Sequence, residues 1–240
     1  MNLRPNCGQI GYMATNHPHF DSTSMAGIIA LVFDLDGTLI DSTTGIGSAL
    51  RAAFQSAGRT MPAVDLRRVI GPPITDIARR IEPSLSDAEL ATIERSYRSN
   101  YDNEGWRETV VYPAVEDTLR AFHRHGLRLF IVTNKPLAPT SNILKHLGLH
   151  DLFIETLTRD GRTPRYTGKS EMLADLISRH GLRRNSTLMI GDTNEDQEAA
   201  HANGLCFLFV TYGYGSVMMP AHSIHHFSEI ATILNVTPMQ

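Results

Sequence analysis

The chain has 240 residues, of which 42% are hydrophobic and 20% are charged, and its formal net charge is -3. These values are typical of a globular protein, and the small negative charge offers no electrostatic basis for binding nucleic acid. No apolar run is long enough to span a membrane, and residues 1–25 lack the apolar core of a secretory signal. We therefore expect a cytoplasmic protein, monomeric or homodimeric, with a poorly ordered N-terminal extension at residues 1–25.

The most informative stretch is the apolar run at residues 28–33, which is followed by Asp34, Asp36 and Gly37. Because the run does not alternate, it predicts a parallel strand that is buried on both faces. The two aspartates lie two positions apart and point the same way in extended backbone, where carboxylates about 4 Å apart repel by about 4 kcal/mol. A cation, a shared proton or splayed side chains must offset this repulsion, and Gly37 permits a tight turn.

The segment at residues 42–109 has only helical periodicity. Apolar residues at helical spacing predict one helix that ends at Gly58, a second through residues 74–81, and a third that begins at Ser86. Glu89 stands three positions after Ser86, which predicts a capping box. Since no strand signal interrupts these helices, we expect residues 42–109 to form a helical cap inserted beside the strand that carries the aspartates.

Strands alternate with helices from residue 110 onward. Strands are predicted at residues 127–132, 152–154, 187–190 and 205–210, and helices at 113–126, before Gly148, at 169–181, before Gly204 and at 227–234. This order is typical of a parallel sheet with right-handed crossovers and helices on both faces. The predicted fold is α/β, with a Rossmann-like three-layer core at residues 26–41 and 110–240 and an inserted α-helical cap.

Polar side chains gather where the predicted strands end or helices begin. The set comprises Asp34, Asp36, Thr133, Lys169, Asp192 and Asp196. Ligands of open α/β sheets bind outside the carboxyl ends of the strands, so we expect these groups to share one crevice. Several carboxylates without a His/Cys cluster favour a hard cation such as Mg²⁺, and the lysine and threonine supply donors to a polyanion. The sequence therefore predicts a phosphate site with a metal.

Four segments resemble the motifs of the haloacid dehalogenase-like (HAD) superfamily. They are Asp-Leu-Asp-Gly-Thr at residues 34–38, Val-Thr-Asn at 132–134, Lys169, and the segment 191–196 that begins Gly-Asp-Thr. Their order and their positions at strand ends also agree, and the resemblance covers about residues 28–214. The helical block between the first two motifs is similar to the cap of phosphoglycolate phosphatase-like and β-phosphoglucomutase-like members.

The resemblance implies a role for each residue. Asp34 would form an aspartyl-phosphate, and Asp36 would protonate the leaving alcohol and then activate water. The implied phosphate-binding residues are Gly37, Thr38, Thr133, Asn134 and Lys169. The implied Mg²⁺ ligands are Asp34, Asp36 through its backbone carbonyl, Asp192, and Asp196 directly or through water or Lys169. Together they imply a Mg²⁺-dependent phosphatase that acts on a small phosphorylated metabolite such as phosphoglycolate.

Other readings stay open at this point. Asp36 argues against a dehalogenase, and residues 42–111 contain no lysine for the Schiff base of a phosphonatase. A β-phosphoglucomutase-like mutase and a non-catalytic binding protein with this fold remain alternatives. Thr133 and Asp196 also suit helix N-termini, and Lys169 also suits a solvated surface. An acidic substrate would need a positively charged partner from the cap. The arginines available there are Arg51, Arg67, Arg68, Arg79 and Arg98.

Overall fold

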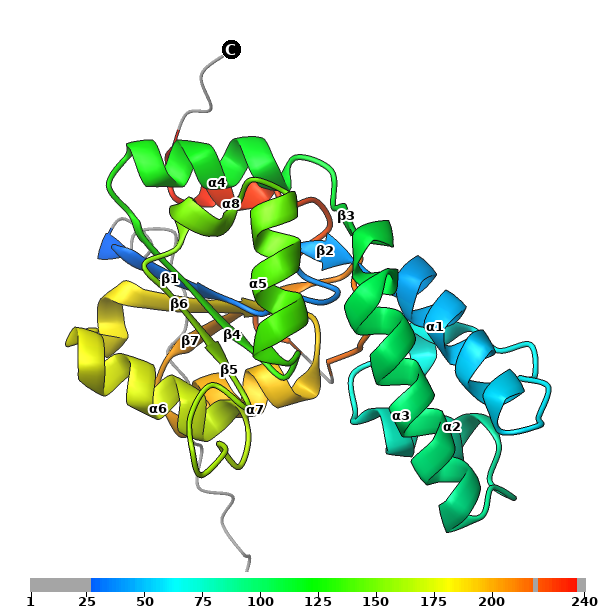
Figure 1. Cartoon of the computed structure of the whole chain (residues 1–240). Helices are drawn as coiled ribbons and strands as arrows, with labels where there is room; N and C mark the ends of the chain where they lie inside the picture. The colour runs from blue at the N-terminus through cyan, green and yellow to red at the C-terminus, as the bar shows by residue number, and fades with distance from the viewer. Residues whose placement is uncertain (1–26, 218–219, 237–240) are drawn as a thin grey trace, which may run out of the picture.

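The computed structural model describes residues 27–217 and 220–236, so the predicted extension at residues 1–25 lies outside the described residues. Its centre is a six-stranded sheet in the order β5-β4-β1-β6-β7-β8, in which every pair of neighbours is parallel (Figure 1). The strands are β1 (Ala30–Phe33), β4 (Arg128–Thr133), β5 (Glu155–Thr158), β6 (Thr187–Gly191), β7 (Cys206–Val210) and β8 (Ser223–Ile224). The predicted α/β fold with a parallel sheet is confirmed.

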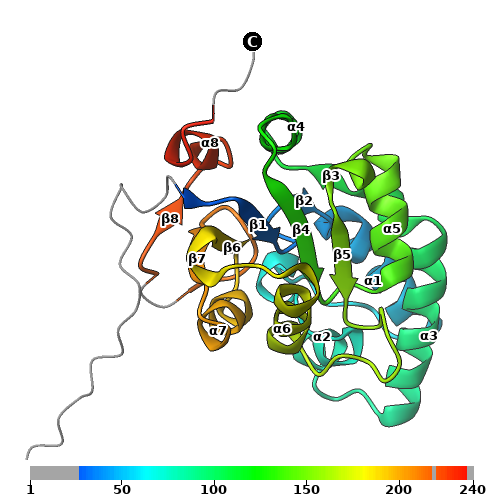
Figure 2. The ribbon, with the colours of Figure 1, turned by 90° about the vertical axis from the view of Figure 1, so that its left-hand side faces the viewer.

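Helices cover both faces of this sheet (Figure 2). One face packs against α4 (Val115–Arg124), α5 (Leu137–His146) and α8 (Glu229–Ile233), and the other against α6 (Lys169–His180) and α7 (Asn194–Ala202). In β1, Leu31 and Phe33 join the first apolar cluster, whereas Ala30 and Val32 join the second. Burying one such large side chain contributes about 2 kcal/mol. The strand lacks alternation because both of its faces are core.

A separate block of helices leaves the core after the first strand. It contains α1 (Thr43–Ser56), η2 (Leu66–Arg68), α2 (Ile74–Ile81), α3 (Asp87–Asn103) and η3 (Gly105–Glu108), which share their own apolar cluster. The capping box of Ser86 and Glu89 at the start of α3 is confirmed. The block joins the core through an antiparallel ribbon of β2 (Ile40–Asp41) and β3 (Val110–Val111). This arrangement supports the proposed cap at residues 42–109.

Two of the predicted boundaries are wrong. The strand expected at residues 152–154 is displaced, because η4 (His150–Leu152) packs the apolar Leu152 into the core and the pairing strand is the polar edge strand β5. The helix expected to begin at Pro113 begins at Val115, because Ala114 has a positive φ of 63°. The strands β2, β3 and β8 were not predicted, since two residues are too few to show a period.

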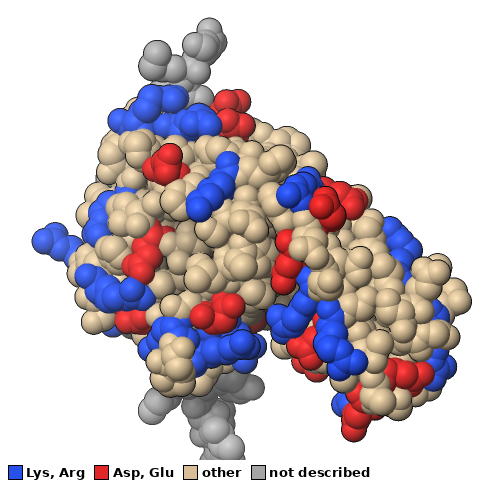
Figure 3. All heavy atoms as spheres, in the orientation of Figure 1, with Lys and Arg blue, Asp and Glu red and all other residues tan. Residues whose placement is uncertain are grey.

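The molecular surface is hollowed where the core and the helical block meet, and basic and acidic side chains are interspersed over this face (Figure 3). No single-signed stretch of the kind that binds a nucleic acid backbone is visible on it. Among the described helices, none has both the length and the apolar character needed to cross a membrane.

Candidate active site

The predicted residues converge because three adjacent parallel strands end at one edge of the sheet. Asp34 directly follows β1, Thr133 is the last residue of β4, and Asp192 directly follows β6. Lys169 begins α6, and Asp196 lies in the first turn of α7. All five residues are at most 4% exposed. The sheet order thus brings together side chains from positions 34 to 196.

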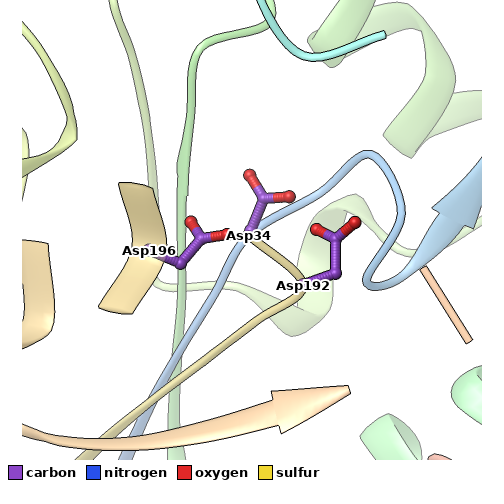
Figure 4. A group of neighbouring side chains, drawn as sticks. All are labelled: Asp34, Asp192 and Asp196. Atoms are coloured by element: carbon purple, nitrogen blue, oxygen red, sulfur yellow. The ribbon is translucent and has the colours of Figure 1, made fainter. Parts of the chain in front are cut away.

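Three carboxylates form the centre of this site (Figure 4). Asp34, Asp192 and Asp196 each offer an oxygen atom, and these atoms all lie within 4.8 Å of one another. The Nζ atom of Lys169 lies 2.6 Å from Oδ1 of Asp34 and 2.6 Å from Oδ1 of Asp196. One ammonium group therefore faces three carboxylates, which leaves an excess of negative charge in a buried space. An all-oxygen donor set with this charge fits a hard divalent cation such as Mg²⁺.

Burial shifts the ionisation of these groups. It raises the pKa of Asp34 well above its usual range, against the lowering effect of Lys169, and the neighbouring Asp196 and Asp192 raise it further. Burial also raises the pKa of Asp192 to about 6, with a contribution from Asp196. Burial alone would lower the pKa of Lys169, but Asp196 and Asp34 raise it above its ordinary value. The site therefore keeps its ammonium charged, and a bound cation would help to keep its carboxylates ionised.

The raised pKa of Asp192 predicts how magnesium affects stability at different pH. In the metal-free protein, Asp192 binds a proton between pH about 4 and about 6, whereas the unfolded chain does not. Its contribution to the free energy of unfolding is present at low pH and is lost as the pH rises through about 6. Since Mg²⁺ binds ionised carboxylates, it should raise Tm more at about pH 7.5 than at about pH 5. Thermal melts check this, and equal increases at both pH values would contradict it.

Asp192 is fixed by backbone groups of the loop after β7. Its Oδ2 accepts hydrogen bonds from the N–H groups of Tyr214 at 2.7 Å and Gly215 at 3.1 Å. The hydroxyl of Thr38 donates to its Oδ1 at 3.3 Å. The side chain of Thr38, predicted as a phosphate-binding residue, thus contacts the Asp192 carboxylate.

Glycines pack directly against the same carboxylate. A Cβ atom on Gly37, whose φ is +88°, would lie 2.3 Å from Oδ2 of Asp192. A Cβ atom on Gly213 would lie 2.3 Å from Cβ of Asp192 and 2.5 Å from the carbonyl oxygen of Gly37. Only glycine fits at these two positions without moving Asp192.

The substitution Gly213→Ala tests this close packing, because no positive φ complicates that position. The added methyl group should displace Asp192 and weaken Mg²⁺ binding by at least about tenfold, as expected for the loss of a well-placed ligand. Isothermal titration calorimetry with Mg²⁺ measures the effect. The control is Gly27→Ala, whose Cβ would meet no atom within 4 Å. Equal Mg²⁺ affinity in both variants would contradict the packing argument.

Asp36 does not belong to the group of three carboxylates, and it pairs with a different lysine. The Nζ atom of Lys135 donates to both of its oxygens, at 3.0 Å and 3.1 Å, and the hydroxyl of Ser42 donates to Oδ1. Asp34 is paired with Lys169, whose Nζ atom contacts Oδ1 of Asp34 and is shared with Asp196. The expected repulsion between the two aspartates is therefore offset by one cation at each carboxylate.

The remaining predicted residues differ in the contacts that they make. Oγ1 of Thr133 accepts a hydrogen bond from the backbone N–H of Lys135 at 3.1 Å. The side-chain amide of Asn134 donates to Glu195 at 2.8 Å, and its Oδ1 is buried without a hydrogen-bond partner among the described residues. Asp196 forms a capping box at the start of α7, as the alternative reading predicted, while it also binds Lys169. The surface reading of Lys169 is wrong, since the residue is 4% exposed.

Sequence reasoning missed Lys135, Ser42 and the loop at residues 213–215. The strand-end rule would have found two of these, because Lys135 stands two residues after the end of β4 and the loop follows β7. The cap arginines are engaged elsewhere: Arg67 pairs with Asp41 of the ribbon at 2.6 Å. The other arginines of this set contact neighbouring side chains: Arg51 contacts Ser48, Arg68 contacts Asp65, Arg79 contacts Asp87, and Arg98 contacts Glu94.

Comparisons with known proteins agree with the fold. Residues 31–210 match a family model described as haloacid dehalogenase-like hydrolase. The chain is 31% identical over 194 residues to the phosphoglycolate phosphatase of Vibrio vulnificus, which covers 77% of this chain and 84% of that protein. It is also 31% identical over 188 residues to the tyrosine-protein kinase PtkA of Mycobacterium tuberculosis, which covers 77% of this chain and 62% of that protein.

Solved structures of similar proteins share the fold of this chain. A haloacid dehalogenase-like family hydrolase from Streptococcus pneumoniae superposes with a TM-score of 0.76 at 28% identity, covering 88% of this chain and 98% of that one. A predicted phosphoglycolate phosphatase from Haemophilus somnus superposes with a TM-score of 0.76 at 25% identity, covering 86% and 98%. The matched segment contains Asp34, Asp36, Thr133, Lys169, Asp192 and Asp196, whereas the loop at residues 213–215 lies after it. The chain therefore belongs to the haloacid dehalogenase-like hydrolase family.

Proposed function

We propose that this hydrolase is a Mg²⁺-dependent phosphatase that cleaves a small phosphomonoester through an aspartyl-phosphate on Asp34. The observation that carries the proposal is the buried cluster in which Lys169 bridges Asp34 and Asp196 beside Asp192. A carboxylate nucleophile, a fixed ammonium and an oxygen-rich metal site are the groups that phosphoryl transfer requires. The relative from Vibrio vulnificus, named a phosphoglycolate phosphatase, supports the same reaction class.

The first half of the reaction transfers the phosphoryl group to the enzyme. A carboxylate oxygen of Asp34 attacks phosphorus, the bond from phosphorus to the alcohol oxygen breaks, and Asp36 gives its proton to that oxygen. Lys169 and Thr133 donate hydrogen bonds to the phosphoryl oxygens. The residues that would hold Mg²⁺ are Asp34, Asp192, the backbone carbonyl of Asp36, and Asp196 directly or through water or Lys169. The metal would supply positive charge that offsets the negative charge of the phosphoryl group.

The second half releases inorganic phosphate. Water attacks phosphorus, the bond from phosphorus to the Asp34 oxygen breaks, and Asp36 accepts the proton that the water loses. Asp34 and Asp36 thereby return to their starting states. Unaided hydrolysis of phosphate monoesters is so slow that enzymes accelerate it by up to about 10²¹-fold, which is why both fixed charge and a metal are needed.

A panel of phosphate esters, with and without EDTA, tests the proposal. It should include p-nitrophenyl phosphate, phosphoglycolate and β-glucose 1-phosphate. We expect metal-dependent release of inorganic phosphate, with phosphoglycolate-like acids among the preferred substrates. Isomerisation of β-glucose 1-phosphate without phosphate release would replace the phosphatase by a mutase. Absence of both reactions would leave a non-catalytic binding protein and refute the proposal.

A further inference from the structure

A second buried lysine joins the site to the helical block. Lys135, whose side chain is 5% exposed, donates to both oxygens of Asp36. Its Nζ atom also lies 4.8 Å from the centre of the Tyr101 ring, which belongs to α3 of the helical block. Tyr101 stacks on Tyr97 of the same helix, with ring centroids 5.4 Å apart. One ammonium group therefore contacts both the core carboxylate and the helix that lies over it.

Asp36 has a second contact with the same block. Ser42, the residue before α1, donates its hydroxyl to Oδ1 of Asp36. The backbone N–H of Ser42 in turn donates to the hydroxyl of Tyr214 at 2.7 Å. The carboxylate is thus held from one side by the end of β4 and from the other by the segment that leads into the helical block.

The energetics favour keeping this set of contacts together. A buried ammonium is costly unless charged and polarisable partners surround it, and a contact with an aromatic face stabilises it more when water is excluded. If α3 moved away, Lys135 would lose the Tyr101 ring and would be opened to water. The position of α3 and the pairing of Lys135 with Asp36 are therefore linked.

We propose that Lys135 is a positioning residue that fixes the Asp36 carboxylate for proton acceptance from water and couples this orientation to the docking of α3 through Tyr101. This inference rests on the proposed function, in which Asp36 takes the proton in the second half of the reaction. Both hydrogen bonds from Lys135 go to the carboxylate oxygens of Asp36, so they fix the direction in which those oxygens point. Attack by Asp34 on an ester with a good leaving group does not need them.

Steady-state kinetics of Lys135→Met with p-nitrophenyl phosphate test the positioning role. Because p-nitrophenolate leaves without a proton, kcat/KM should change by less than about threefold, whereas kcat should fall by at least about tenfold. KM should fall with kcat, and phosphorylated enzyme should accumulate and be detectable after acid quench. The matched control is Lys145→Met, an exposed lysine on α5, which should behave as the wild type. Proportional loss of kcat and kcat/KM would overturn the positioning role.

Two Tyr101 variants test the link to the helical block and remain informative if Lys135→Met does not fold. Tyr101→Phe keeps the ring face, so its kcat should not fall more than its kcat/KM. Tyr101→Leu removes the ring face, so its kcat should fall more than its kcat/KM, as in Lys135→Met but by a smaller factor. Equal behaviour of the two Tyr101 variants would overturn the link.

A fluorescence measurement tests docking without reference to activity. Trp106 is the only tryptophan in the chain, and its ring packs edge-on against His146 of α5, with centroids 5.6 Å apart. Acrylamide should quench it more strongly in Lys135→Met and Tyr101→Leu than in Lys145→Met. Identical quenching in all three would contradict the docking role of Lys135. A wild-type protein without any turnover would instead refute the proposed function, and the positioning role with it.

Discussion

Replacing Asp34 with asparagine should lower kcat by at least about 10³-fold, as expected when a nucleophile is removed. The amide has nearly the same volume, but it cannot attack phosphorus to form an acyl phosphate. The variant should fold, because Lys169 keeps its hydrogen bond to Asp196 at 2.6 Å. Burial already raises the pKa of Asp34, so loss of its charge also relieves repulsion from the other carboxylates.

Phosphate release from p-nitrophenyl phosphate, measured beside the folded fraction from circular dichroism, checks this expectation. The control is Asp151→Asn, whose side chain is 99% exposed and which should keep the wild-type rate. An Asp34→Asn variant that turns over at the wild-type rate would rule out Asp34 as the phosphoryl acceptor.

Replacing Lys169 with methionine should cost both stability and activity. The substitution leaves Asp34, Asp192 and Asp196 without their buried ammonium, and breaking such a pair typically destabilises a protein by about 3–5 kcal/mol. Activity should fall by about 10²-fold or more, because a donor to the phosphoryl oxygens is lost. Added Mg²⁺ should restore part of the stability, since it offsets the same negative charge.

Urea unfolding with and without Mg²⁺ measures the stability change, and kinetics with p-nitrophenyl phosphate measure the activity. The exposed Lys145 again provides the control, because Lys145→Met removes a positive charge from the surface of α5 and not from the buried site. If Lys169→Met matched Lys145→Met in both measurements, the ammonium would have no role in balancing the site.

The main lines of the site could be predicted because its residues stand at the ends of strands that are plain in the sequence. The run at residues 28–33 and the aspartates after it define one strand end, and Thr133 and Asp192 define two more. The sheet order, with β1 between β4 and β6, is what turns these separate ends into one crevice. That order depends on packing of the whole chain, which local periodicity does not report.

The residues that sequence reasoning missed act through tertiary contacts. Nothing in the local pattern indicates that Asp36 turns toward Lys135, or that Tyr101 of α3 covers that lysine. Likewise, β5 is a polar edge strand, so the more apolar turn before it gave the stronger strand signal. Local patterns predicted which strand ends bring polar side chains together, whereas the partners of each side chain required the folded arrangement.

The most direct test of the whole account is the location of the phosphoryl group during turnover. Acid quench of the wild-type enzyme with a fast-reacting ester and Mg²⁺, followed by peptide mass spectrometry, should place one phosphoryl group on Asp34, and Asp34→Asn should carry none. The Lys135→Met variant should raise the phosphorylated fraction. A phosphoryl group on any other residue, or phosphate release with no phosphorylated Asp34 at any time point in either enzyme, would contradict the account.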